Sequence, residues 1–96
     1  MKHIFIINPA AGKYDRTEEF SGKIAAACAS RGLDYAIHVS EKPGDCRDAA
    51  RRAAESGEEV RLYACGGDGT LNEVVNGAAG FANAAVTHFP GGSGND

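Results

Sequence analysis

The sequence predicts an α/β fold: a three-layer α/β/α arrangement with an open parallel sheet and the element order β-α-β-α-β-α-β. Two observations predict it. Short runs of β-branched and aromatic residues alternate along the chain with segments whose apolar residues recur at helical spacing. The loops between them are short, so successive strands are expected to lie parallel and to be joined by right-handed crossovers through helices. A length of 96 residues is enough for one such domain.

The first half of the chain is expected to form two strands with a helix between them. Residues 3–7 are a continuous apolar run, as in a buried strand, and residues 35–39 form the second strand. The helix is expected to start near Asp15, which has an acid three residues later, and to stop at Gly32. Its apolar face comprises Phe20, Ile24, Ala27 and Cys28.

The second predicted helix has Asp45 as its cap and ends at Gly57. Its core-facing side chains are small and follow the i, i+3, i+4, i+7, i+8 pattern, which suits close packing on a sheet. They are Cys46, Ala49, Ala50, Ala53 and Ala54.

Two further strands are expected, over residues 60–65 and 84–89. Between them, Thr70 and Glu73 have the spacing of a capping box, with Thr70 as the N-cap and Glu73 as the third helical residue. The third helix is therefore expected to begin at Thr70. Its predicted core face comprises Leu71, Val74, Val75, Ala78 and Ala79.

Charge is unevenly distributed along the chain. The formal net charge is −3, and there are 13 glycines. All 10 Lys and Arg lie within residues 1–61, whereas residues 62–96 hold eight of the glycines, three acids and no Lys or Arg. A nucleic-acid-binding surface needs clustered cations, so this class of function is disfavoured. The apolar runs are too short for a transmembrane helix, and no signal-peptide pattern follows Lys2.

The cysteines and histidines show no metal-binding pattern. Cys28, Cys46 and Cys65 are an odd number, are widely spaced and form no C-x-x-C pair. Neither a disulfide framework nor a zinc site is indicated, and each thiol is expected to be a small core residue. This usage favours a cytoplasmic location. The three histidines lack metal-ligand spacing and are expected to be structural.

Three polar loops follow predicted strands, over residues 8–13, 66–72 and 90–96. Ligands of open parallel sheets bind at the carboxyl ends of the strands, so we expect these loops to meet there, together with Ser40. Residues 66–72 begin with three glycines in four positions, which permit positive φ angles and a close approach of backbone to ligand. The following helix directs free N–H groups and the positive end of its dipole to the same place. This combination predicts an anion site that needs no Lys; the alternative is a tight strand-to-helix turn.

Asp68 is an acid inside this predicted phosphate-binding turn, where its negative charge would repel a phosphate. We therefore expect its carboxylate to have a chemical role. It could hold Mg²⁺ or accept the proton of an attacking hydroxyl. Standard nucleotide motifs do not fit, because Gly12-Lys13 is followed by Tyr14 and no complete G-x-G-x-x-G is present. A phosphate site here would belong to another class.

Residues 66–77, Gly-Gly-Asp-Gly-Thr-Leu-Asn-Glu-Val-Val-Asn-Gly, strongly resemble the diacylglycerol kinase catalytic domain, which is shared with sphingosine kinases and bacterial lipid kinases. The first five residues alone would also suit NAD kinases or phosphofructokinases, and the extension selects the lipid-kinase branch. Residues 7–13 are similar to the family's opening nucleotide loop, and residues 90–96 to its closing Gly-Thr-Gly-Asn-Asp loop. The implied fold is the N-terminal domain of the NAD kinase and diacylglycerol kinase type.

The resemblance implies ATP as phosphoryl donor, Mg²⁺ as cofactor and a hydroxyl of a lipid such as diacylglycerol as acceptor. It implies Asp68 as the catalytic acid, with its role as base or metal organiser left open. By position, the family's nucleotide contacts fall on Asn8, Pro9, Ala10, Ala11, Gly12, Ser40, Gly66, Gly67, Asp68, Gly69, Thr70, Leu71, Asn72 and Ser93. Ser40 and Ser93 stand where the family usually has Thr, which keeps the hydroxyl.

Members of this family continue into a β-rich C-terminal domain that contributes acceptor binding, whereas this sequence ends in a glycine-rich loop. We therefore expect residues 1–96 to be the ATP-binding domain of a lipid kinase, truncated before that domain and inactive alone. Two alternatives stay open: a non-catalytic nucleotide-binding module acting through a partner chain, and an NAD kinase-like or sugar kinase. A cytoplasmic protein is expected, and peripheral membrane contact and a homodimer are left open.

Overall fold

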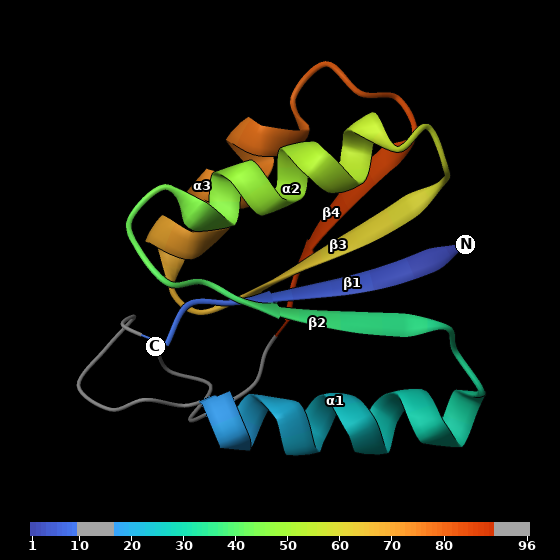
Figure 1. The fold of residues 1–96 in the computed structure, drawn as a ribbon. Helices are drawn as coiled ribbons and strands as arrows, with labels where there is room; N and C mark the ends of the chain where they lie inside the picture. The colour runs from blue at the N-terminus through green and yellow to red at the C-terminus, as the bar shows by residue number, and fades with distance from the viewer. Residues whose placement is uncertain (10–16, 90–96) are drawn as a thin grey trace.

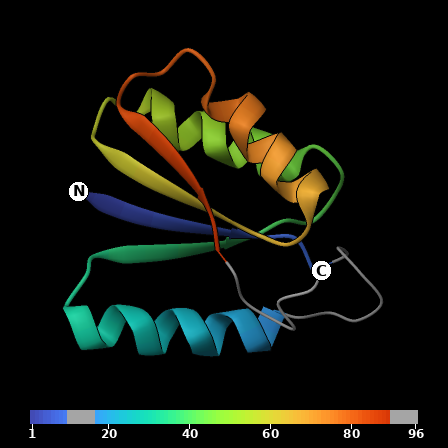
Figure 2. The same ribbon diagram turned by 180° about the vertical axis from the view of Figure 1, so that it is seen from behind.

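The computed structural model of the chain describes residues 1–9 and 17–89, which form a four-stranded parallel sheet with helices on both faces. The elements are β1 (Lys2–Ile7), α1 (Thr17–Arg31), β2 (Tyr35–Val39), α2 (Asp45–Glu55), β3 (Val60–Cys65), α3 (Asp68–Ala78) and β4 (Ala84–His88). Figures 1 and 2 show α1 alone on one side of the sheet and α2 and α3 together on the other. The predicted fold class and element order are confirmed.

The strand order is β2-β1-β3-β4, and all neighbouring strands are parallel. β1 and β3 are central, which explains why their sequences are rich in apolar residues. β2 is an edge strand, where three large apolar side chains remain about one-third exposed: Tyr35, Ile37 and Val39. None of the helices in the described part of the chain has the length and hydropathy of a membrane span.

Each face of the sheet has its own core. Under α2 and α3, Ile6 of β1 lies level with Ala64 of β3, and both are completely buried against the small side chains of α2 and against Val74. Under α1, Phe5 stacks on Tyr63 with ring centroids 4.2 Å apart. The buried residues of that second core are Phe5, Ile7, Phe20, Ile24, Cys28 and Cys65. The prediction that all three cysteines are buried and unpaired is confirmed.

The predicted start of the third helix is wrong. α3 begins at Asp68, and its N-cap is Gly67, whose carbonyl oxygen accepts the N–H of Leu71 at 3.2 Å. Thr70 is therefore inside the first turn, where its side chain is buried and its hydroxyl oxygen has no hydrogen-bond partner. One carboxylate oxygen of Glu73 is also buried without a partner, so no capping box forms. Glycine is an accepted N-cap residue, and it lets the chain turn directly out of β3.

Several residues predicted to face the core are exposed: Ala27 of α1, Val75 of α3, and Ala79, which directly follows α3. Val75 is 45% exposed, whereas Gly77 is buried. For Val75, the reason is that α3 approaches α2 through Gly77, and this close contact sets the rotation of α3 about its axis. The N-cap of α2 is likewise Gly44 in the left-handed conformation, not Asp45. Asp15, the predicted start of α1, lies outside the described residues.

Candidate functional site

The ends of three strands are tied together at the carboxyl edge of the sheet. The backbone N–H of Asn8, just after β1, donates to the carbonyl oxygen of Cys65 at the end of β3, 3.2 Å away. The N–H of Ser40, just after β2, donates to the carbonyl of Ile7 at 2.8 Å. These bonds bring Asn8, Ser40 and the start of the glycine-rich turn to one place, the edge at which open parallel sheets bind ligands.

The turn between β3 and α3 consists of Gly66 and Gly67. A methyl group built on Gly67 or on Gly69 would meet no atom within 4 Å. Neither Gly67 nor Gly69 has a positive φ, so of the two properties expected of these glycines only the close approach of backbone to ligand applies at both positions. Their lack of side chains is therefore not required by the fold around them, and it leaves open space in which a ligand can approach the backbone.

The first turn of α3 adds hydrogen-bond donors to this space. The backbone N–H groups of Asp68, Gly69 and Thr70 belong to the helix start, where no preceding turn can accept from them. They lie at the positive end of the helix dipole, which favours anions. Asp68, the first residue of α3, is exposed. The turn and the helix start together can hold a phosphate-like group with backbone donors alone.

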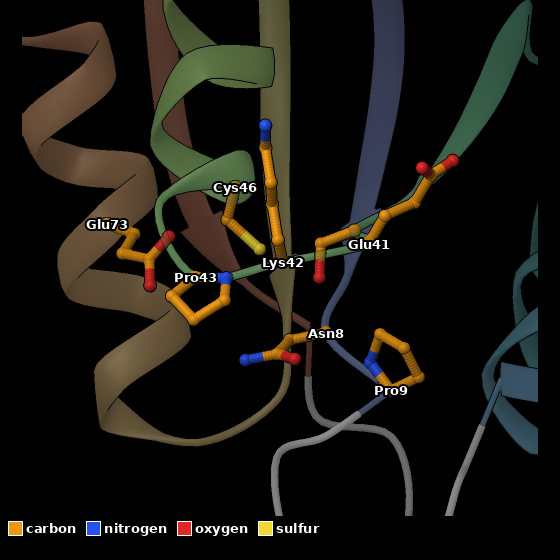
Figure 3. Close-up of a pocket in the computed structure, with 8 residues that line it drawn as sticks. Asn8, Pro9, Glu41, Lys42, Pro43, Cys46 and Glu73 are labelled. Atoms are coloured by element: carbon orange, nitrogen blue, oxygen red, sulfur yellow. The ribbon is translucent and has the colours of Figure 1, made fainter.

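A cavity of about 260 Å³ lies at the same edge of the sheet, between the ends of β1 and β2, the start of α2 and the middle of α3 (Figure 3). It is lined by Asn8, Pro9, Ser40, Glu41, Lys42, Pro43, Cys46 and Glu73. This volume suits part of a nucleotide rather than a whole one. Figure 3 shows the Glu73 carboxylate reaching from α3 toward Pro43 and Cys46.

Cys46, which lines this cavity, and its neighbour Asp45 have shifted pKa values. Burial raises the pKa of the Cys46 thiol, which Ser40 partly offsets through a side-chain hydrogen bond. The pKa of Asp45 is lowered chiefly by the backbone N–H of Glu41, which donates to its carboxylate at 2.9 Å. The His38 ring lies 3.3 Å from the same oxygen. Asp45 thus fastens the loop that forms one wall of the cavity, and Cys46 remains a neutral thiol.

The structure brings seven of the ten predicted site residues that it describes to this edge. Asn8, Pro9 and Ser40 line the cavity, and Gly66 to Gly69 form the turn and the helix start. The Thr70 side chain points into the core and Leu71 packs against it, whereas Asn72 is exposed. Four predicted contacts lie outside the described residues: Ala10, Ala11, Gly12 and Ser93.

Sequence reasoning missed some of the residues at this edge. The cavity wall contributed by Glu41, Lys42 and Pro43 was not predicted, although its position directly after Ser40 is a usable signal. His88 was predicted to be structural, yet its ring nitrogen Nε2 lies 2.8 Å from the carbonyl oxygen of Gly66 in the glycine turn. No sequence pattern links these two positions, because the contact depends on β4 lying beside β3.

Comparisons with known proteins agree with one another. The family model described as diacylglycerol kinase catalytic domain matches residues 2–96. The chain is 42% identical over 77 residues to a diacylglycerol kinase of Staphylococcus aureus (strain bovine RF122 / ET3-1), covering 77% of this chain and 23% of that protein. It is 43% identical over 77 residues to a diacylglycerol kinase of Staphylococcus epidermidis (strain ATCC 12228 / FDA PCI 1200), with the same coverage.

A crystal structure of a diacylglycerol kinase from Bacillus anthracis (strain Sterne) has the same fold, with a TM-score of 0.67 and 29% sequence identity. The superposition covers 99% of this chain and 32% of that one. The chain therefore spans about a quarter to a third of the length of these relatives.

Proposed function

This chain belongs to the diacylglycerol kinase catalytic domain family, and we propose that it is the part of a lipid kinase that binds ATP for transfer of the γ-phosphate to a lipid hydroxyl. The named relatives are diacylglycerol kinases, which supports diacylglycerol as the acceptor. Because the chain spans only part of their length, acceptor binding and transfer belong to a larger protein in this proposal. Contact with a membrane surface would then come with the lipid.

The observation that carries the proposal is the open turn formed by Gly66 and Gly67 in front of α3. The N–H groups of the turn and helix start would hold the phosphates, which explains how residues 62–96 can serve a polyanion without a Lys or Arg. The adjoining cavity at Asn8 and Ser40 would take part of the nucleoside. Asp68, beside the phosphates, would accept the proton of the acceptor hydroxyl or orient a metal ion.

The described residues fit Mg²⁺ only as a companion of ATP. They include no group of three or more His, Cys, Asp and Glu side chains that could bind a metal by themselves. Mg²⁺ is usually held by one or two carboxylates together with substrate phosphates and water. The exposed carboxylate of Asp68 at the helix start meets that requirement. A metal bound there would neutralise charge on the transferred phosphoryl group.

Isothermal titration calorimetry of the 96-residue chain with Mg-ATP tests the proposal. Gly67→Asp adds a carboxylate in the open turn, where its Cβ would meet no atom within 4 Å, so it should weaken binding by about tenfold or more through like-charge repulsion. The matched control is Gly22→Asp in α1, which makes the same charge change in equally open space away from the site. Absence of binding by the unchanged chain, or equal binding by both variants, would contradict the proposal.

In a full-length protein that carries this chain, Asp68→Asn tests the second half of the proposal. It should reduce phosphoryl transfer to diacylglycerol about 100-fold or more, because the carboxylate that accepts the proton or binds the metal ion would be lost. Mg-ATP should still bind, since the backbone donors remain. Full transfer activity in Asp68→Asn would remove Asp68 from the mechanism.

A further inference from the structure

The imidazole ring of His88, the last residue of β4, contacts the glycine turn from the neighbouring strand. Its Nε2 atom lies 2.8 Å from the carbonyl oxygen of Gly66. A carbonyl oxygen can only accept, so Nε2 carries a proton and donates this hydrogen bond. The two residues are 22 positions apart in sequence and meet because β4 pairs with β3.

This bond fixes the orientation of one peptide group. The carbonyl of Gly66 and the N–H of Gly67 belong to the same planar trans peptide, so they point in opposite directions. A peptide between two glycines can turn over at low steric cost, because neither residue has a Cβ. Holding the Gly66 carbonyl therefore also sets the direction of the Gly67 N–H.

The neighbouring carbonyl groups are held as well. The carbonyl of Cys65 accepts from the N–H of Asn8, and the carbonyl of Gly67 accepts from the N–H of Leu71, each at 3.2 Å. Three successive carbonyl oxygens, which would repel a phosphate, are thus engaged by donors. Only the middle one, on Gly66, depends on a side chain, that of His88.

We propose that His88 is a positioning residue of the phosphate-binding turn: its Nε2–H holds the Gly66–Gly67 peptide so that the Gly67 N–H is presented to the phosphates of the nucleotide. The inference rests on the proposed function, because it concerns the same site. The other two histidines have side-chain partners of their own, Tyr63 for His3 and Asp45 for His38, so this role falls to His88 alone among them.

Two substitutions separate a hydrogen-bonding role from a packing role. His88→Phe keeps a ring but has no donor, whereas His88→Gln has no ring but can place an amide N–H near the position of Nε2. The proposal predicts that His88→Phe weakens Mg-ATP binding about 3- to 10-fold, the usual contribution of one such hydrogen bond, and that His88→Gln stays within about twofold of the unchanged chain. A packing role predicts the reverse order.

Nuclear magnetic resonance of the nucleotide-free chain tests whether His88 holds the Gly66–Gly67 peptide in one orientation. The Gly67 amide should give one sharp signal in the unchanged chain and in His88→Gln, and a broadened or doubled signal in His88→Phe. His3→Phe, which removes the hydrogen bond to Tyr63 at the far end of the sheet, is the matched control and should leave the Gly67 signal and Mg-ATP affinity unchanged.

The outcomes are distinct. An unchanged Gly67 signal in His88→Phe, or unchanged Mg-ATP affinity in that variant, overturns the positioning role while leaving the proposed function in place. Loss of affinity in His88→Gln equal to that in His88→Phe also overturns it. Failure of the unchanged chain to bind Mg-ATP at all refutes the proposed function, and this outcome refutes the positioning role as well.

Discussion

Gly77 of α3 packs directly against the backbone carbonyl oxygen of Arg47 in α2. A methyl group built on Gly77 would overlap that oxygen and would lie 2.9 Å from the Cβ of Ala50. The two helices lie side by side over the sheet, so this contact fixes their separation (Figure 1). Since α3 also carries the proposed phosphate site at its N-terminus, a shift of the helix would move the site.

We predict that Gly77→Ala destabilises the chain. Alanine has a higher helix propensity than glycine. Here, however, its methyl group would meet backbone atoms of α2 that cannot move without shifting that helix. Overpacking of this kind costs about 1–3 kcal/mol. The free energy of unfolding, measured by urea denaturation, should fall by that amount.

The matched control is Gly22→Ala in α1. Gly22 is exposed, and a methyl group there would meet no atom within 4 Å. The substitution should therefore stabilise the chain by about 0.5–1 kcal/mol through helix propensity alone. Equal effects of the two substitutions would show that the contact between Gly77 and Arg47 is not tight.

Asn83, just before β4, joins two segments of the chain. Its side-chain amide donates to the carbonyl oxygens of Ala54 at 2.8 Å and Glu58 at 2.9 Å. Asn83→Ala should lower the free energy of unfolding by about 1–2 kcal/mol, because both carbonyls lose a donor. Asn83→Asp should cost more, since it places a carboxylate oxygen against two acceptors.

Thermal denaturation of the two Asn83 variants checks this prediction. Asn76→Ala, on the exposed face of α3, is the control and should change the free energy of unfolding by no more than about 0.5 kcal/mol. Asn83→Asp as stable as the unchanged chain would mean that these two hydrogen bonds do not form in solution.

The sequence was sufficient to predict the strands and their order along the chain. Ile6 and Leu62 are completely buried and lie in runs rich in apolar residues, and such runs are visible without a structure. The order of strands in the sheet was not predicted. Ile37 lies in an apolar run that resembles the other strands in sequence. The strand order places this run at an edge of the sheet, where Ile37 is about one-third exposed.

Helix starts and long-range contacts were less predictable. Thr70 and Glu73 match a capping box in sequence, but the chain leaves β3 in a direction that lets Gly67 accept the first helical hydrogen bond. Burial of Thr70 then follows from the packing of α3 on the sheet. The bond from His88 to Gly66 depends on strand pairing, so local sequence cannot reveal it.

Acid should weaken the loop that forms one wall of the cavity. The N–H of Glu41 and the ring of His38 lower the pKa of Asp45 in the folded chain. In acid the unfolded chain therefore binds more protons at Asp45 than the folded chain does. The resulting stability is present above the unfolded pKa, near 4, and is lost as the pH falls through the lower folded value. The melting temperature should thus drop between about pH 5 and pH 3.

Comparison of Asp45→Asn with Asp48→Asn checks the source of this drop. Asp48 is on the same helix but is half-exposed, and its ion pair with Arg47 is at the surface. Asp45→Asn should flatten the dependence of melting temperature on pH, whereas Asp48→Asn should leave it close to that of the unchanged chain. An equally steep dependence in Asp45→Asn would assign the acid sensitivity to other carboxylates.

The three cysteine thiols should resist alkylation in the folded chain. Cys28, Cys46 and Cys65 are buried, and burial raises the pKa of each, that of Cys65 to about 12. At pH 8, a thiol with a pKa of about 12 is ionised in about one molecule in ten thousand, and the thiolate is the reactive form.

Intact-mass spectrometry after treatment with iodoacetamide should show almost no modification of the folded chain and triple modification in urea. Ala26→Cys, which adds an exposed thiol on α1, should gain one rapid modification. If the folded chain reacted as fast as this variant, the cysteines could not all lie in the two cores.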